Sequence, residues 1–258
     1  MYTRFMYNIG FEIEKQFIPT IVRDVRIKEV KFEIIKEVIK EPSCGEEIIT
    51  HPMELTSNMN KRKEIFNKFI EAQHLIATPI TVKCGTHATL TIEGENDGEK
   101  LLEKIKPYAS VLYALYKNRL FNNYCCGNFC LLTDKEIEKG IEGLNNKEYK
   151  YNTISSYADR LEFRLFPAIK NHKELYYLYS LIYIVVDSAY KQVDQNEYLN
   201  KIKNFLEDYY WKPSALENLF FNAKWFNKAI LNRETNPIIS KYIRNTKWPE
   251  SYQGKRNI

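Results

Sequence analysis

The sequence feature that most constrains the fold is a strict alternation of apolar and polar residues near the amino terminus. Apolar side chains occupy every second position from residue 5 to residue 13, namely Phe5, Tyr7, Ile9, Phe11 and Ile13. Because side chains on a strand alternate between its two faces, this spacing predicts a strand with one apolar face. The opposite face then carries Glu12 and Glu14, about 7 Å apart at the rise of a strand. Two carboxylates that point the same way repel each other unless water, a cation or a basic side chain compensates them.

Two further segments, residues 46–50 and 86–93, predict strands with a polar face that could complement this pair. In the first segment Glu47 points to the polar face, although a slip of the register by one residue would put Glu46 in its place. In the second, the apolar residues at positions 88, 90 and 92 leave His87 on the polar face. Taken singly, a solvated strand face and a structural histidine also explain these residues.

Residues 160–166 form the last clear strand pattern. The apolar residues at 161, 163 and 165 take the core side, which leaves Arg160, Glu162, Arg164 and Phe166 on the other side. Glu162 and Arg164 could form an ordinary ion pair on one face. With the other strands they complete a set of four carboxylates, an imidazole and an arginine. Carboxylates suit Mg²⁺ or Mn²⁺, and an arginine suits a phosphate, which is the combination that phosphoryl transfer requires.

The remaining periodic segments indicate helices, so the chain belongs to the α+β class. Helices are expected from about residue 60 to 77, capped by Ser57 or Asn58, and then over residues 99–121, 173–192, 197–209 and 214–231. Residues 25–39 and 80–84 are expected to be extended, the former with a turn or bulge near Glu29. The sequence shows no repeat or linker, and the simplest account is a single α+β domain over residues 1–258.

Composition narrows the class of partner. The 38 basic residues are nearly balanced by 33 acidic ones and interleaved with them, which argues against a nucleic-acid-binding surface. The five cysteines are odd in number and irregularly spaced, which favours thiols over a disulfide framework. The most apolar run, residues 175–186, is too short to cross a bilayer core of about 30 Å, and no signal peptide precedes the first strand. We therefore expect a cytoplasmic protein without a membrane partner.

Four short motifs occur in an order that resembles the amidoligase family, a group of carboxylate–amine ligases with a glutamine synthetase-like fold. They are Gly10-Phe-Glu-Ile-Glu14, Glu41-Pro-Ser-Cys-Gly-Glu-Glu-Ile-Ile-Thr-His-Pro52, Cys84-Gly-Thr-His87 and Leu161-Glu-Phe-Arg-Leu-Phe166. The resemblance covers residues 5 to about 186, and the helical region from 187 to 258 carries none of the motifs. It implies an antiparallel sheet with helices on one face and with ATP and Mg²⁺ (or Mn²⁺) on the polar face.

The resemblance also implies roles for particular residues. The expected metal ligands are Glu12, Glu14, Glu47, Glu162 and His87, the last of which would contact either metal or nucleotide phosphate. Arg164 would stabilise charge on the transferred phosphoryl group, with Glu12 and Glu162 beside it as catalytic groups. Arg119, which precedes a Tyr-Cys pair as in the family, would also contact the nucleotide. ATP would phosphorylate a carboxylate of a small molecule or peptide, and an amine would displace phosphate to give an amide. A homo-oligomer stays open.

Two departures from the family pattern leave alternatives open. Glu41 stands where the family usually has aspartate, and Thr89 stands where it often has a second histidine. Either change could alter metal geometry or substrate choice. A phosphotransferase of the same fold therefore remains an alternative, as does a protein that binds a nucleotide or a partner without turnover.

Overall fold

The structure is a computed structural model that describes residues 6–18, 32–81, 83–116, 119, 121–122, 125–126 and 154–209. It divides into two compact units, Met1–Asn96 with Ala158–Tyr183 and Asp97–Tyr157 with Ile184–Ile258. The single domain expected from the sequence stays a prediction. The expected helix over residues 214–231 and the expected turn near Glu29 lie outside the described residues.

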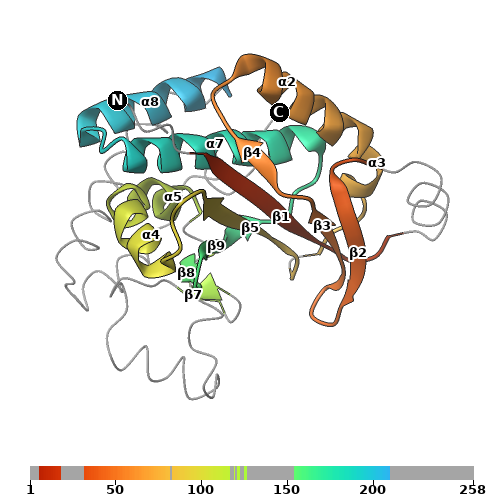
Figure 1. Cartoon of the computed structure of the whole chain (residues 1–258). Helices are drawn as coiled ribbons and strands as arrows, with labels where there is room; N and C mark the ends of the chain where they lie inside the picture. Colours follow the sequence, from red (N-terminus) through yellow and green to blue (C-terminus); the bar gives the residue numbers. More distant parts are fainter. Residues whose placement is uncertain are drawn as a thin grey trace, which may run out of the picture. The chain divides into compact units, whose positions relative to one another are not determined.

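The first unit is built on an antiparallel sheet with the strand order β2-β3-β1-β5-β9 (Figure 1). A further short strand, β4, pairs with β1 beyond the end of β3. The chain is therefore of the α+β class with an antiparallel sheet, as the sequence analysis expected. The strands are β1 (Tyr7–Lys15), β2 (Ile35–Glu41), β3 (Gly45–Thr50), β4 (Met53–Leu55), β5 (Gly85–Ile92) and β9 (Arg160–Pro167).

The alternation in β1 appears in the structure as alternating burial. Tyr7, Ile9, Phe11 and Ile13 are buried, whereas the residues between them as far as Glu12 are half-buried. Burying each large apolar side chain contributes about 1.5–3 kcal/mol. The predicted apolar face of this strand is confirmed, and it determines which face of the sheet receives the helices.

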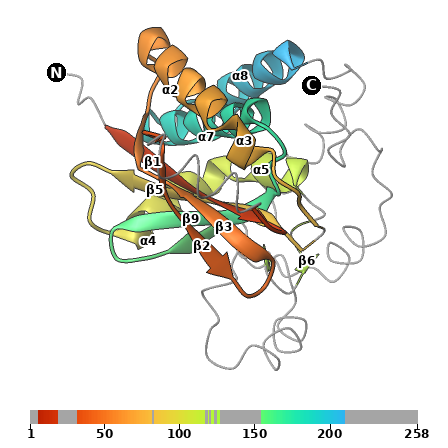
Figure 2. The ribbon, with the colours of Figure 1, turned by 90° about the vertical axis from the view of Figure 1, so that its right-hand side faces the viewer.

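Helices α2 (Met59–Glu71) and α3 (Gln73–Ile76) and the first part of α7 (His172–Tyr190) lie on this apolar side of the sheet (Figure 2). The ring of Phe69 on α2 meets that of Phe11 edge-on, with 6.5 Å between the centroids. Asn58 caps α2, because its side chain accepts hydrogen bonds from the backbone of Asn60 and Lys61. The helix expected from residue 60 to 77 was wrong in one respect, since it breaks at Ala72 and α3 follows.

Arg62 joins α2 to α7. Its guanidinium donates to the Tyr176 hydroxyl at 3.2 Å and to the Ser180 hydroxyl. It also lies 5.3–5.7 Å from the ring centroids of Tyr176, Tyr179 and Tyr183. Such cation–π contacts contribute about 0.5–2 kcal/mol each, so this cluster holds the helical layer together behind the sheet.

The expected strand over residues 80–84 was wrong. Its described residues lie outside any strand, and the Cys84 backbone N–H donates to the Thr81 carbonyl oxygen at 3.1 Å, which closes a turn. Strand β5 begins only at Gly85. The hydrogen-bonded turn takes precedence here over local β-propensity, which depends strongly on context.

The second unit contains helices α4 (Gly98–Ile105), η1 (Lys106–Tyr108), α5 (Ser110–Leu115) and α8 (Gln195–Asp208). The single helix expected over residues 99–121 was wrong, because Pro107 lacks a backbone N–H and the chain tightens to a 3₁₀ turn there. Tyr108 and Tyr198 pack edge-on with 5.0 Å between their centroids. The short strands are β6 (Phe121–Asn122), β7 (Cys125–Cys126) and β8 (Ile154–Ser156).

A helix must be both long and apolar to cross a membrane. None of the helices in the part of the chain that the structure describes combines the length and the apolar character needed to span a bilayer.

Candidate functional site

The register of three strands assembles the site on the face of the sheet opposite the helices. Glu12 on β1 pairs with His87 on β5, and Glu14 pairs with Glu47 on β3. Neither pairing contains a shift of register. Residues at the same level of neighbouring strands lie about 4.5–5.5 Å apart, so the pairing itself brings these groups together.

Glu12, Glu47 and His87 approach one another closely enough to share a metal ion. One ligand atom from each lies within 4.8 Å of the others. The His87 Nδ1 atom is 3.4 Å from the Glu12 Oε2 atom. His87 and Glu47 are only 6% and 7% exposed, whereas Glu12 is half-buried. The three groups therefore form a largely desolvated cup that opens on the side of Glu12.

Strand β9 adds a carboxylate and an arginine to the cup. The Glu162 Oε1 atom lies 3.6 Å from the His87 Nδ1 atom and accepts a hydrogen bond from the Arg164 Nη1 atom. Both side chains are mostly buried. An arginine fixed by a carboxylate beside the His87 imidazole is placed to meet an anionic oxygen there.

A β-bulge shapes β9 next to the site. Thr86 pairs with Phe166, but Ala88 pairs with Phe163, so β9 has one more residue than β5 in this interval. The rings of Phe163 and Phe166 stack with 6.2 Å between their centroids, and both residues are fully buried. The expectation that Phe166 shares the polar face was therefore wrong, because strict alternation does not continue through a bulge.

Glu14 is anchored by the backbone. Its Oε2 atom accepts a hydrogen bond from the Gly85 backbone N–H, and its Oε1 atom lies 3.8 Å from the His87 Nε2 atom. Glu14 is 8% exposed. One oxygen is thus held by the protein while the other faces the imidazole, which suits a group that positions His87 or ligates an ion with a single oxygen.

The electrostatics of the cup favour a bound cation. Burial, together with the nearby carboxylates of Glu12, Glu14 and Glu41, raises the pKa of Glu47 to about 8. The hydrogen bond from His87 holds the pKa of Glu12 below its usual range, assisted by the charges of His87 and Arg164. At neutral pH Glu47 is therefore protonated for much of the time. A bound divalent cation would offset both the burial and the repulsion that keep it protonated.

The structure shows which of the adjacent residues Glu46 and Glu47 faces the cup. The Glu46 Oε2 atom accepts a hydrogen bond from the Ile18 backbone N–H, whereas Glu47 belongs to the cup.

Glu41, the first departure from the family pattern, accepts hydrogen bonds from the Ser43 backbone and hydroxyl at 3.2 and 2.8 Å. Thr89, the second departure, lies opposite Gly10. The ligand roles expected for the cup residues stay predictions, although the structure brings these residues together.

Arg119 belongs to the second unit, where its backbone N–H donates to the Tyr116 carbonyl oxygen at 2.8 Å. Its expected contact with a nucleotide stays a prediction.

Sequence reasoning missed a buried lysine directly behind the site. Lys15 is 0% exposed, and its Nζ atom donates to the carbonyl oxygens of Ile76, Ile169 and Thr78 at 2.5, 2.6 and 3.4 Å. Burial lowers the pKa of Lys15 to about 8. The signal was present in the sequence, because Lys15 continues the apolar parity of Ile9 to Ile13 and was therefore due to point into the core.

The donor set fits a hard divalent cation. Carboxylate oxygens are the ligands that Mg²⁺ and Mn²⁺ prefer, and one imidazole is compatible with Mn²⁺ in particular. The raised pKa of Glu47 shows that the protein alone does not fully compensate these carboxylates. A scan against protein-family models finds no match to the chain, and a search of curated proteins finds none either.

Proposed function

We propose that this protein is an ATP- and Mg²⁺-dependent carboxylate–amine ligase with a glutamine synthetase-like catalytic fold. The observation that carries the proposal is the convergence of Glu12, Glu47 and His87, each with a ligand atom within 4.8 Å of the others. Four strands distant in sequence supply the groups of the cup, and they include every carboxylate named by the family resemblance.

The fold supports the same proposal. An antiparallel sheet with helices on one face leaves its other face for ligands, and the acidic groups lie near the middle of that face on β1 and its neighbours. Sites on strands are held more rigidly than sites on loops, which suits chemistry that depends on positioning. A fold by itself hosts many functions, so the argument rests on the cup rather than on the class of fold.

Each group of the cup has a task in such a reaction. Glu12, Glu47 and His87 would hold the metal ion, and the Gly85 N–H would fix Glu14 beside them. Bound ATP and Mg²⁺ would supply the phosphoryl group that activates the substrate carboxylate as an acyl phosphate, from which an amine displaces phosphate.

Arg164 would meet the negative oxygens that develop during this transfer, while Glu162 holds its guanidinium in place. Preorganised charges of this kind contribute most when water is excluded, as it largely is around the buried Arg164 and His87.

Metal binding is the first test of the proposal. Wild type should bind Mn²⁺, as measured by electron paramagnetic resonance, and Glu12→Gln should weaken binding by about a hundredfold because it removes a charged ligand. Glu46→Gln is the matched control, since it removes the neighbouring carboxylate that belongs to the Ile18 contact, and it should bind as wild type does. Equal affinity in all three proteins would refute the metal site.

Product analysis separates the ligase from its rivals. A ligase should release ADP only when a carboxylic acid and an amine are both present, and the product should contain a new amide. ADP release with a phosphorylated acceptor and no amide would instead identify a phosphotransferase. Mn²⁺ and nucleotide binding without ADP release, over a broad set of acids and amines, would identify a binding protein without turnover.

A further inference from the structure

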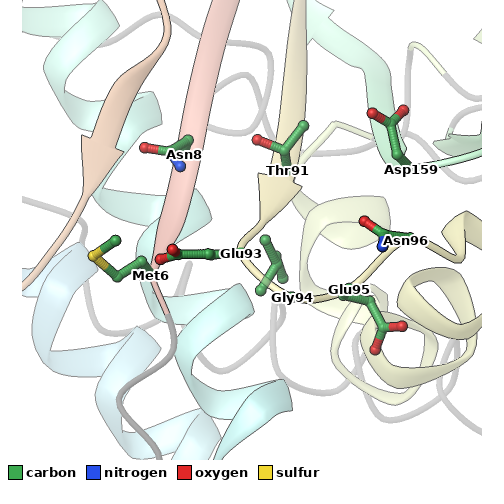
Figure 3. A pocket seen from close by; sticks show the side chains of 9 residues that line it. Met6, Asn8, Thr91, Glu93, Gly94, Glu95, Asn96 and Asp159 are labelled. Carbon is green, nitrogen blue, oxygen red and sulfur yellow. The ribbon is translucent and has the colours of Figure 1, made fainter.

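A pocket lies at the opposite end of β1 and β5 from the cup. It has a volume of about 480 Å³ and is open to solvent. Figure 3 shows the side chains that line it. Asn8 and Thr91, which face each other in the register of the two strands, line it together with Glu93, Glu95 and Asn96 from the turn after β5. Asn8 has the same parity on β1 as Glu12, and Thr91 the same parity on β5 as His87. The pocket and the cup therefore share one face of the sheet.

The charged side chains that line the pocket are all acidic, namely Glu93, Glu95 and Asp159. Asp159 is partly compensated, because its carboxylate lies 3.3 Å from the guanidinium of Arg160. Met6 and Ile92 add apolar surface. Such a lining favours a cationic group on an apolar chain and repels the phosphates and carboxylates of the other substrates.

Gly10 and Thr89, paired in register, form the strip of face between the pocket and the cup. A Cβ atom added at Gly10 would meet only the Thr50 carbonyl oxygen within 4 Å among the described residues, at a distance of 4.0 Å. Gly10 is also not among the glycines with positive φ. Within the described part of the chain, neither packing nor backbone conformation requires glycine here, and glycine weakens a strand. Its missing side chain leaves space above the sheet among these same residues.

The strip is long enough to hold an extended small molecule. Asn8 and Glu12 are four positions apart on β1, which is about 13 Å at the rise of a strand. A ligand that reacts at the cup could therefore lie along Gly10 and reach the acidic pocket with its far end.

We infer that the strip and the pocket bind the amine substrate, and that this amine is elongated and carries a second cationic group, as in a diamine or a lysine-like side chain. The inference rests on the proposed function, since the reacting nitrogen must lie at the cup. The second cation binds among Glu93, Glu95 and Asp159, and Gly10 is the residue that keeps the path between the two ends open.

Direct binding without ATP tests the pocket. The probe is 1,8-diaminooctane, and its control is 8-amino-1-octanol, which has a similar length but one charge fewer. Wild type should bind the diamine about fivefold more tightly by calorimetry, the effect of one or two partly exposed ion pairs. The double variant Glu93→Gln/Glu95→Gln should lose this preference. The double variant Glu37→Gln/Glu71→Gln, which removes the same charge at exposed positions elsewhere, should keep it.

Gly10→Val tests the path. Valine is favoured in strands, so the variant should fold and bind Mn²⁺ as wild type does, while its affinity for the diamine falls at least tenfold. Unchanged diamine affinity in a folded Gly10→Val protein would overturn the path. If the variant does not fold, the acidic double variant decides alone, and a preference that survives in it would overturn the pocket.

The outcomes also separate this inference from the proposed function. Mn²⁺ binding with no preference for the diamine overturns the inference and leaves the ligase proposal standing. If adenosine competes with the diamine and displaces it, the pocket binds the nucleotide instead, and the inference is likewise overturned. A diamine preference in a protein that does not bind Mn²⁺ refutes the proposed function and, with it, the role of the pocket in binding a substrate.

Discussion

Glu14 and Lys15 are adjacent on β1 but point to opposite faces of the sheet. The regions around their side chains differ in how a buried charge is compensated. Behind the sheet, burial lowers the pKa of Lys15 to about 8, but its ammonium donates to three backbone carbonyl oxygens that the fold itself supplies. In front, Glu14 lies beside the buried Glu47, whose pKa is raised to about 8 by burial and by the neighbouring carboxylates. A charge that is satisfied internally serves the fold, whereas one left among like charges calls for a partner from outside.

The largest effect is expected from Lys15→Met. The substitution keeps the volume but leaves the carbonyl oxygens of Ile76 and Ile169 without their donor, and it should destabilise the protein by roughly 3 to 5 kcal/mol. Urea unfolding measures the change. Lys68→Met is the control, because Lys68 forms surface ion pairs with Glu33 and Glu64 and should lose less than about 1 kcal/mol. Similar losses in both variants would remove the contrast between the two regions.

The pH dependence of stability sharpens the other half of the comparison. The folded pKa of Glu47, about 8, exceeds the ordinary value of 4.5, so the folded state binds the proton more tightly than the unfolded state. Stability should therefore fall as pH rises from about 4.5 to about 8, by the order of 2–4 kcal/mol for this group. Glu47→Gln should remove this fall.

Urea unfolding with EDTA at pH 5 and pH 8 measures it, as the difference between wild type and Glu47→Gln. In a second series with Mn²⁺ in place of EDTA, the fall should become smaller in wild type alone, since the ion binds the ionised carboxylate. If the stability of Glu47→Gln depended on pH as that of wild type does, Glu47 would not be the group responsible for the fall.

A smaller effect is expected for Glu14, because the Gly85 N–H already occupies one of its oxygens. Glu14→Gln should weaken Mn²⁺ binding by about tenfold, as removal of a positioning group or of a single-oxygen ligand does, against about a hundredfold for Glu47→Gln. Titrations of both variants under identical conditions give the ratio. If Glu14→Gln proved the more damaging, the metal would lie nearer to Glu14 than the cup geometry indicates.

The smallest effect should come from Glu46→Gln. It weakens the hydrogen bond from the Ile18 N–H, and we expect a loss of about 1 kcal/mol or less in stability with no change in Mn²⁺ affinity. Unfolding and metal titration on one preparation check both values. Loss of Mn²⁺ binding would mean that β3 pairs with β1 one residue away from the register seen here.

The sequence predicted those parts of the fold that depend on alternation alone. The faces of β1 follow directly from its pattern, and the same logic placed Glu12, Glu14 and His87 on one face. It could not decide between Glu46 and Glu47, because adjacent glutamates leave the pattern ambiguous until the pairing of Glu14 with Glu47 is known.

Other features depend on irregularities that periodicity does not encode. The bulge in β9 buries Phe166, and the turn at Thr81 to Cys84 replaces an expected strand. Lys15 was overlooked for a different reason, since its carbonyl acceptors come from segments far away in the chain. Contacts of this kind follow from the three-dimensional arrangement and not from any local spacing.

The bulge in β9 also determines how that strand tolerates changes in length. Removal of Leu165 would restore one-to-one pairing with β5 and leave Glu162, Arg164 and the phenylalanines on their present sides. The same single-codon deletion at Ile13 of β1, whose pairing is regular, would turn Glu14 into the core and Lys15 out toward the ligand face. Insertions and deletions in related chains should therefore collect in β9 and be absent from β1, and an alignment that forces β9 to be gapless would misassign the residues after the bulge.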